Sequence, residues 1–160
     1  MNENGVEAAK TFTESVDNLF SEITSWVADT NLHTTLQPTE ISEETTGKYR
    51  INKLTLADTN GKMVAELVPV GAFVIGASGR INLNGKIDDA ILLKLDAGGP
   101  AMDIETTVAG VTESKTVPFF RNVKESGWYW IESSRLGRAN LLTKELFAEL
   151  LWGVSEYALT

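Results

Sequence analysis

The sequence has 160 residues, a length typical of one domain whose core needs neither a metal nor a disulfide for stability. It contains no cysteine, which excludes a disulfide framework and thiolate metal sites. The formal charge of −8 lies entirely in residues 1–47, which hold nine acidic residues and Lys10 as their only Lys or Arg. This distribution argues against nonspecific binding of nucleic acid or anionic lipid by the N-terminal segment.

The N-terminal residues lack the basic start and the apolar run of a secretory signal. The most apolar stretch, Met63–Ala77, is interrupted by Glu66, Pro69 and Gly71 and falls short of the roughly 20 apolar residues that a membrane helix needs. We therefore expect a soluble protein located in the cytoplasm, with neither a membrane nor a nucleic acid as its partner.

Residues 1–29 are predicted to form an amphipathic helix. Apolar residues recur there at alternating intervals of three and four: Ala9, Phe12, Val16, Leu19, Ile23 and Trp26. Such a stripe can cover one face of the chain's own sheet. The same spacing is typical of a coiled-coil seam, so a homodimer formed through this helix is the alternative interpretation.

Residues 30–47 contain Pro38, two acidic-polar clusters and few large apolar side chains. We interpret this segment as an acidic linker with one short extended piece. The only histidine of the chain, His33, lies in it. Without a cysteine or a second histidine nearby, His33 makes a poor metal ligand, and we interpret it as a polar loop residue.

Between residues 48 and 132 the apolar pattern changes to a period of two, which is typical of strands. Met63–Ala77 predicts a core strand pair with a bend at residues 69–71. Turn signals recur every eight to twelve residues, beginning with Asn60-Gly61. Later strands are expected at 80–83, 87–95, 104–108, 117–123 and 128–131. Together they predict six to eight antiparallel strands in a meander or a partly closed barrel.

The C-terminal helix is predicted over residues 143–158, with Thr143 as its N-cap. Its apolar stripe is wide enough for a packed helix. Gly153 lies within it and suggests a close approach to a neighbouring element. The whole chain is thus expected to be a single α+β domain, with an antiparallel sheet flanked by an N-terminal amphipathic helix and a C-terminal apolar helix.

The strongest candidate site is the aromatic strand near residue 130 and its basic surroundings. Residues 114–144 hold six basic and two acidic residues. Trp, Tyr and Arg are enriched at interface hot spots, so this segment predicts an interaction surface. Its candidate residues are Arg121, Trp128, Trp130, Arg135 and Arg138. The alternative is purely structural, a core strand followed by a charged loop.

A loose acidic set is the second candidate: Asp88, Asp89, Asp96, Asp103 and Glu105. Paired carboxylates can perform acid–base chemistry or bind a divalent cation, although carboxylates on turns are also ordinary. A pocket between Arg80, this set and the aromatic strand would suit a small-ligand-binding protein or a hydrolase. The glycine-rich turn at 76–80 lacks the lysine of a phosphate-binding loop and the spacing of a nucleophile elbow.

The sequence shows no nucleotide-binding glycine pattern and no cluster of metal-ligating residues, so we expect neither a cofactor nor a metal. These features favour a non-catalytic protein-interaction or adaptor protein that binds another protein or itself. In size, charge and layout the chain resembles bacterial secretion chaperones and toxin-immunity proteins. That resemblance rests on no motif and implies no site residues.

Overall fold

The computed structural model describes the chain except for residues 1–2, 75–76, 100, 119, 121 and 133–136. Two helices and nine strands follow one another along the described chain: α1 Glu3–Val27, β1 His33–Glu43, β2 Gly47–Ala57, β3 Met63–Gly71, β4 Gly79–Gly85, β5 Asp89–Leu95, β6 Ala101–Val108, β7 Val111–Pro118, β8 Gly127–Ile131, β9 Ala139–Leu141 and α2 Lys144–Ser155. The α+β prediction with two flanking helices is confirmed.

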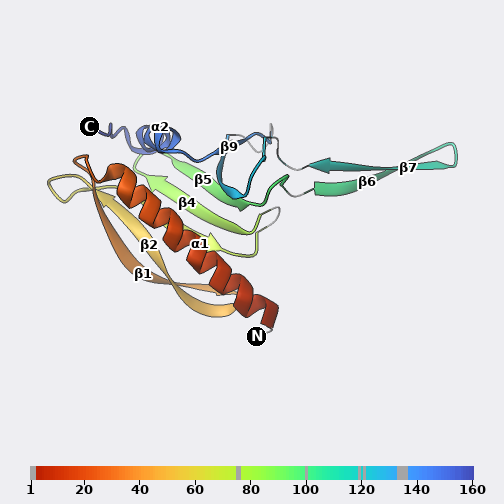
Figure 1. The fold of residues 1–160 in the computed structure, drawn as a ribbon, viewed down its shortest axis with the longest axis horizontal. Helices are drawn as coiled ribbons and strands as arrows, with labels where there is room; N and C mark the ends of the chain where they lie inside the picture. The colour runs from red at the N-terminus through yellow and green to blue at the C-terminus, as the bar shows by residue number, and fades with distance from the viewer. Residues whose placement is uncertain (1–2, 75–76, 100, 119, 121, 133–136) are drawn as a thin grey trace.

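Seven strands form one antiparallel sheet in the order β1-β2-β3-β4-β5-β8-β9. Neighbours in the sheet follow one another along the chain except where β6 and β7 are left out, so the sheet is a meander (Figure 1). β1 and β9 are its two edges and do not pair with each other, so the predicted alternative of a partly closed barrel is not formed. β6 and β7 pair only with each other, as a separate two-stranded sheet.

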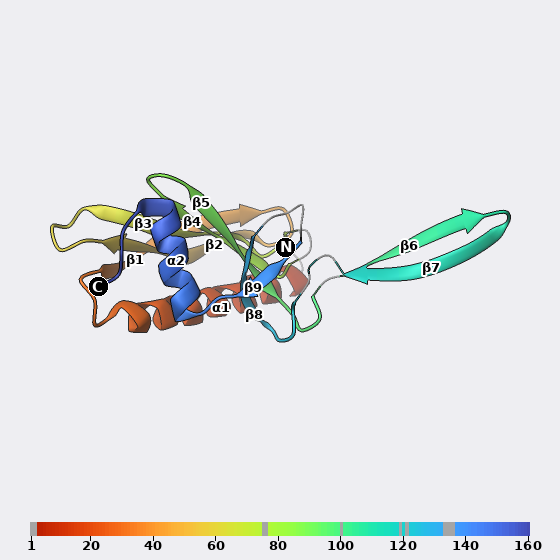
Figure 2. The same ribbon diagram turned by 90° about the horizontal axis from the view of Figure 1, so that it is seen from above.

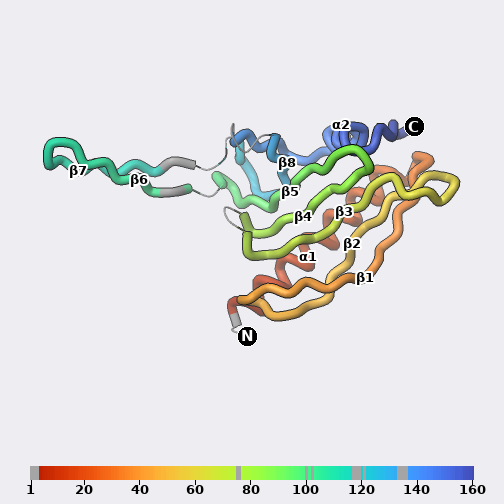
Figure 3. Tube along the Cα trace, turned by 180° about the vertical axis from the view of Figure 1, so that it is seen from behind, coloured from red at the N-terminus to blue at the C-terminus, as the bar shows by residue number. Residues whose placement is uncertain are grey.

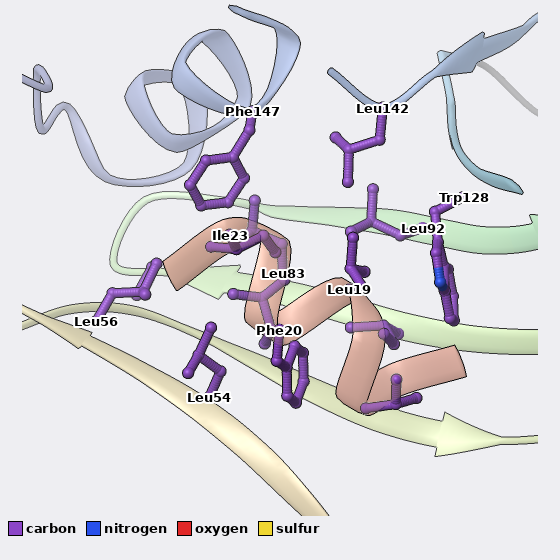
Figure 4. Packing of buried hydrophobic residues seen from close by; sticks show 14 of the residues in the cluster. Leu19, Phe20, Ile23, Leu54, Leu56, Leu83, Leu92, Trp128, Leu142 and Phe147 are labelled. Atoms are coloured by element: carbon purple, nitrogen blue, oxygen red, sulfur yellow. The ribbon is translucent and has the colours of Figure 1, made fainter. Parts of the chain in front are cut away.

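Both helices lie on the same face of the large sheet. The apolar stripe of α1 is buried there, with Phe12, Val16 and Ile23 at 2% exposure or less. Figure 4 shows Phe147 of α2 above Ile23 of α1, beside side chains of the sheet such as Leu83. The rings of Trp26 and Phe147 lie 6.0 Å apart between centroids. The stripe therefore covers the chain's own core, as the first interpretation of the helix predicted.

On the opposite face of the sheet, described residues at the β5–β8–β9 end are covered. There Leu93, Leu95 and Tyr129 form a second apolar cluster with Val123, which lies in the segment before β8. Farther along, β1 to β4 have no helix over this face, as the view from behind shows (Figure 3). Lys53 and Glu66 form an ion pair at 3.4 Å on this face.

The predicted linker at 30–47 is wrong, because residues 33–43 form β1, an eleven-residue strand. β1 pairs along its whole length with β2, in a ladder that runs from His33 opposite Ala57 to Glu43 opposite Gly47. It is an edge strand with mostly exposed side chains, so its sequence carries little of the apolar alternation that marks a half-buried strand. Pro38 is tolerated there because one side of an edge strand makes no ladder hydrogen bonds, so a missing N–H donor on that side costs nothing.

The second strand predicted for residues 72–77 is not seen in the described part of that segment, which holds only an isolated bridge between Val74 and Ala77. The bend before it is real, because the β3–β4 ladder shifts register between Pro69 and Gly71. The strand predicted at 117–123 is seen only at residues 117–118, which end β7. The described residues 120, 122 and 123 are in no strand, and residues 119 and 121 lie outside the described part of the chain. The chain instead folds residues 101–118 into a hairpin that extends away from the rest of the protein (Figure 2).

Candidate interaction surface

The two predicted tryptophans of β8 face the helices. Trp128 is 7% exposed, its ring lies 6.4 Å from that of Phe12, and its Nε1 donates to the carbonyl oxygen of Ser15 at 3.4 Å. Trp130 is partly buried against the same core. Trp128 thus has little surface to offer a partner, and it connects β8 to α1.

The predicted arginines lie after and before this strand. Arg138 is exposed, and its guanidinium lies 3.6 Å from the carboxylate of Glu132. Arg121 and Arg135 lie outside the described residues. The prediction of a basic interaction surface therefore stays a prediction, for which the structure provides Arg138 as an accessible residue.

The acidic set is spread over the molecule. Asp88 and Asp89 lie at the start of β5, Asp96 follows its end, and Asp103 and Glu105 lie on the separate hairpin. Among the described residues, no three His, Cys, Asp or Glu side chains are grouped so that they could hold a metal ion. Arg80 donates through Nε to Asn82 Oδ1 at 2.9 Å on the face away from the helices, so it does not join the acidic residues and the tryptophans in one pocket.

One cavity is lined by three residues of the predicted pocket, namely Trp130, Asp88 and Asp89. It has a volume of about 310 Å³ and lies between α2 and the sheet. Glu149 also contributes to its lining. The three carboxylate residues are exposed, and Trp130 is partly buried. Carboxylates beside an indole ring suit a cationic group.

The exposed face of α1 is acidic: it carries Glu7, Glu14, Asp17 and Glu22, with Lys10 as its basic residue. In the described part of the chain two ion pairs are formed, Lys53–Glu66 and Arg138–Glu132, and neither includes α1. The charge separation found in the sequence is therefore not neutralised by ion pairs between the acidic helix and the basic segment in the described residues.

The most accessible element is the hairpin of β6 and β7, residues 101–118, which we call the arm. Every described side chain from Asp103 to Thr116 is exposed. Val108 and Val111 at its tip are 68% and 63% exposed. Two-stranded hairpins are only marginally stable in water, and independent stability needs a third strand or a covered apolar face. The arm thus presents backbone and apolar groups that nothing in the described chain covers.

The two faces of the arm differ in chemistry. Directly opposed residues share a face, so Ile104, Val108 and Val111 lie on one side with Glu113 and Lys115. Asp103, Glu105 and the facing Thr and Ser residues lie on the other. That polar side makes its own cross-strand hydrogen bonds, from Thr116 Oγ1 to Asp103 Oδ1 at 2.8 Å and between the hydroxyls of Thr107 and Thr112 at 2.9 Å.

The tip of the arm explains why the sequence predicted a strand at 104–108 but not the hairpin. Ala109 and Gly110 both have positive φ, 54° and 79°, which is the backbone of a two-residue type I′ turn. The usual signal for that turn is Asn-Gly or Asp-Gly, and alanine rarely adopts positive φ. The Thr and Val residues on both sides of the turn are the remaining signal, because β-branched residues favour strands.

No family model, no curated protein and no solved structure matches this chain. No helix among the described residues is both long and apolar enough to cross a bilayer.

Proposed function

We propose that the protein is a non-catalytic protein-interaction protein and that the arm is the element that contacts its partner. The observation that carries this proposal is an amphipathic two-stranded sheet in which every described side chain from Asp103 to Thr116 is exposed. Protein chains often recognise one another by adding a strand to such an edge, where main-chain hydrogen bonds supply affinity and side chains supply specificity.

The way the arm is attached supports the same conclusion. Its first and last residues, Ala101 and Pro118, lie opposite each other in the ladder, so the arm begins and ends at one place. The seven-stranded sheet is complete without it, since β5 pairs directly with β8 across the insertion. The core therefore does not need the arm, and a role outside the core accounts for its exposed Ile104, Val108 and Val111.

Photo-crosslinking tests this proposal in the cells that make the protein. Benzoylphenylalanine replaces Val108 at the arm tip or, as a control, Ile87, a 58% exposed residue in the turn between β4 and β5. We expect a discrete protein adduct from position 108 and none from position 87. Replacing residues 101–118 with a short Gly-Ser turn should leave a folded body. An absence of adducts at position 108, or equal adducts at both positions, would contradict an interaction role for the arm.

A second candidate function is the binding of a small ligand in the cavity under α2. It is favoured by Trp130 and three carboxylate residues that line the same volume of about 310 Å³. A small organic amine should then raise the melting temperature of the wild type more than that of the Glu149→Gln variant. A carboxylic acid of the same size serves as the control ligand, and equal shifts for the two ligands would count against the cavity.

A further inference from the structure

We infer that the partner of the arm is the arm of a second copy, and that the two arms pair antiparallel through their β7 edges, centred on Ser114. This inference rests on the proposed function and specifies the partner. The resulting sheet would have four strands, in the order β6-β7-β7-β6, with a two-fold axis beside Ser114. Such an isologous contact is the commonest way in which identical chains form a closed dimer.

The charges of β7 select this edge and this partner. β7 carries Glu113 and Lys115, on either side of Ser114 and on the same face. In an antiparallel pair centred on Ser114, Glu113 of each copy lies directly opposite Lys115 of the other, so two cross-strand ion pairs form. Opposite charges in directly opposed positions stabilise a sheet, and like charges destabilise it.

The β6 edge lacks this self-complementarity. Its charged residues are Asp103 and Glu105, and it has no basic residue. Two copies of β6 centred on Ile104 would place Asp103 opposite Glu105, and a pairing centred on Glu105 would place that residue opposite itself. Both arrangements oppose like charges, so β6 is the outer strand of the proposed four-stranded sheet.

The backbone N–H and C=O groups around Ser114 point in the direction that the pairing requires. In the type I′ turn, Val108 and Val111 form the hydrogen-bonded pair that closes the hairpin. Hydrogen-bonded and non-hydrogen-bonded pairs alternate along an antiparallel ladder. The N–H and C=O groups of Glu113 and Lys115 therefore point to β6, whereas those of Thr112, Ser114 and Thr116 point outward, where a second β7 would lie.

The other free edges of the described sheets are less suited to accept a strand. β1 is long but has Pro38 in its middle, which lacks an N–H and protects an edge from pairing. β9 has only three residues. β7 has eight residues, and its only proline, Pro118, is at its end. Within the described chain, the outer edge of β7 is thus the free edge that is long, has no proline before its end, and carries both an acidic and a basic residue.

Charge reversal tests the pairing on the full-length purified protein. Dimerisation is measured by sedimentation from about 10 µM to about 1 mM, because a contact of this size is expected to be weak. Glu113→Lys and Lys115→Glu should each weaken dimerisation about tenfold or more, since each change turns two attractive pairs into two repulsive ones. Glu105→Lys, on β6, is the matched control and should change it much less.

The two variants should rescue each other. An equimolar mixture of the E113K and K115E chains opposes two lysines to two glutamates, and we expect heterodimers to form as well as the wild-type dimer does. The double variant E113K/K115E should also regain self-association. Rescue in both experiments cannot arise from a general loss of stability in the single variants. Single variants that dimerise like the wild type, or a mixture that shows no rescue, would overturn the inference.

A disulfide trap provides an independent test, because the protein contains no cysteine. Directly opposed strand residues have Cα atoms about 4.5–5.5 Å apart, within the range that a disulfide spans. Ser114→Cys should therefore form a covalent dimer under mild oxidation, and Thr107→Cys on β6 of the same arm should form much less. Equal trapping at both positions, or none at position 114, excludes the β7 pairing. The photo-crosslink at position 108 stays informative in that case, because an adduct with a different protein would uphold the interaction role while excluding the second copy.

Discussion

At the scale of single residues, the carboxylate of Glu43 is the best-satisfied charged group in the described chain. It accepts hydrogen bonds from the Tyr49 hydroxyl at 2.8 Å and from the backbone N–H groups of Ala72 and Phe73 at 3.2 and 2.9 Å. A Cβ built at Gly71 would collide with the same carboxylate, so a larger residue there would displace Glu43 from these contacts. Glu43 thereby fixes the end of the β1–β2 hairpin to the bend that follows β3.

We expect Glu43→Ala to lower the free energy of unfolding by about 1–3 kcal/mol, because the N–H of the buried Ala72 loses its acceptor. Glu40→Ala is the control. It changes an exposed glutamate on the same strand and should stay within about 0.5 kcal/mol of the wild type. Urea denaturation of the three proteins measures both values. Equal stability of the two variants would show that the Glu43 contacts contribute nothing.

Tyr49 makes this contact depend on pH. Burial of the phenol, together with its hydrogen bond to the Glu43 carboxylate, raises the pKa of Tyr49 above its ordinary value of 10. The folded state therefore favours the neutral phenol. The stabilisation is complete below pH 10 and is lost as the pH rises further, because the phenol of the unfolded chain ionises first.

The stability difference between the wild type and Tyr49→Phe should accordingly shrink as the pH rises above about 10. Denaturant unfolding at each pH measures it, and the other titrating groups cancel in the difference. A difference that does not change with pH would contradict the assigned environment of Tyr49.

At the scale of elements, α2 docks on the sheet through a close approach of two backbones. Gly85, the last residue of β4, lies against the carbonyl group of Val154. The same carbonyl oxygen accepts hydrogen bonds from the N–H groups of Ile87 and Asp88 at 2.9 and 3.2 Å. Thr143 caps the start of α2 as predicted, and its hydroxyl accepts from the N–H of Leu146 at 3.1 Å. The close approach predicted at Gly153 is wrong, because a Cβ built there meets nothing within 4 Å.

Alanine at these two glycines should therefore have opposite effects. Gly85→Ala is expected to destabilise the protein by about 1–3 kcal/mol, because the new methyl group forces α2 away from the β4–β5 turn. Gly153→Ala should stabilise it by up to about 1 kcal/mol through the higher helix propensity of alanine. Thermal or urea unfolding gives the sign of each change. Destabilisation by both substitutions would mean that α2 packs differently.

At the scale of the whole molecule, the chain separates a closed core from an open arm. The helices, the seven-stranded sheet and the segment before β8 bury their apolar side chains in two clusters. The arm leaves the sheet after β5 and returns before β8 without interrupting their pairing (Figures 1 and 2). If the arm contacts a partner as proposed, this separation would let the partner bind and leave while the core stays folded.

The sequence by itself determined the elements whose signals are local. The spacing of Phe12, Val16 and Ile23 predicted α1 and its buried face, and Thr143 marked the start of α2. Period-two alternation and turn signals predicted an antiparallel sheet of the right size. Amphipathic periodicity is visible wherever one face of an element meets a core, because the core itself imposes the pattern.

Only the tertiary structure decided the features that depend on partners distant in sequence. β1 is a strand because β2 pairs with it, and its own exposed side chains carry no core pattern. Trp128 belongs to the core because α1 lies against it, which the aromatic pattern of β8 left open. The arm is exposed on both faces, so no core imposed apolar alternation on it, and its Ala109-Gly110 turn lacks the usual signal. The sequence therefore predicted one strand of the arm, at 104–108, but not its pairing with 111–118 in a hairpin.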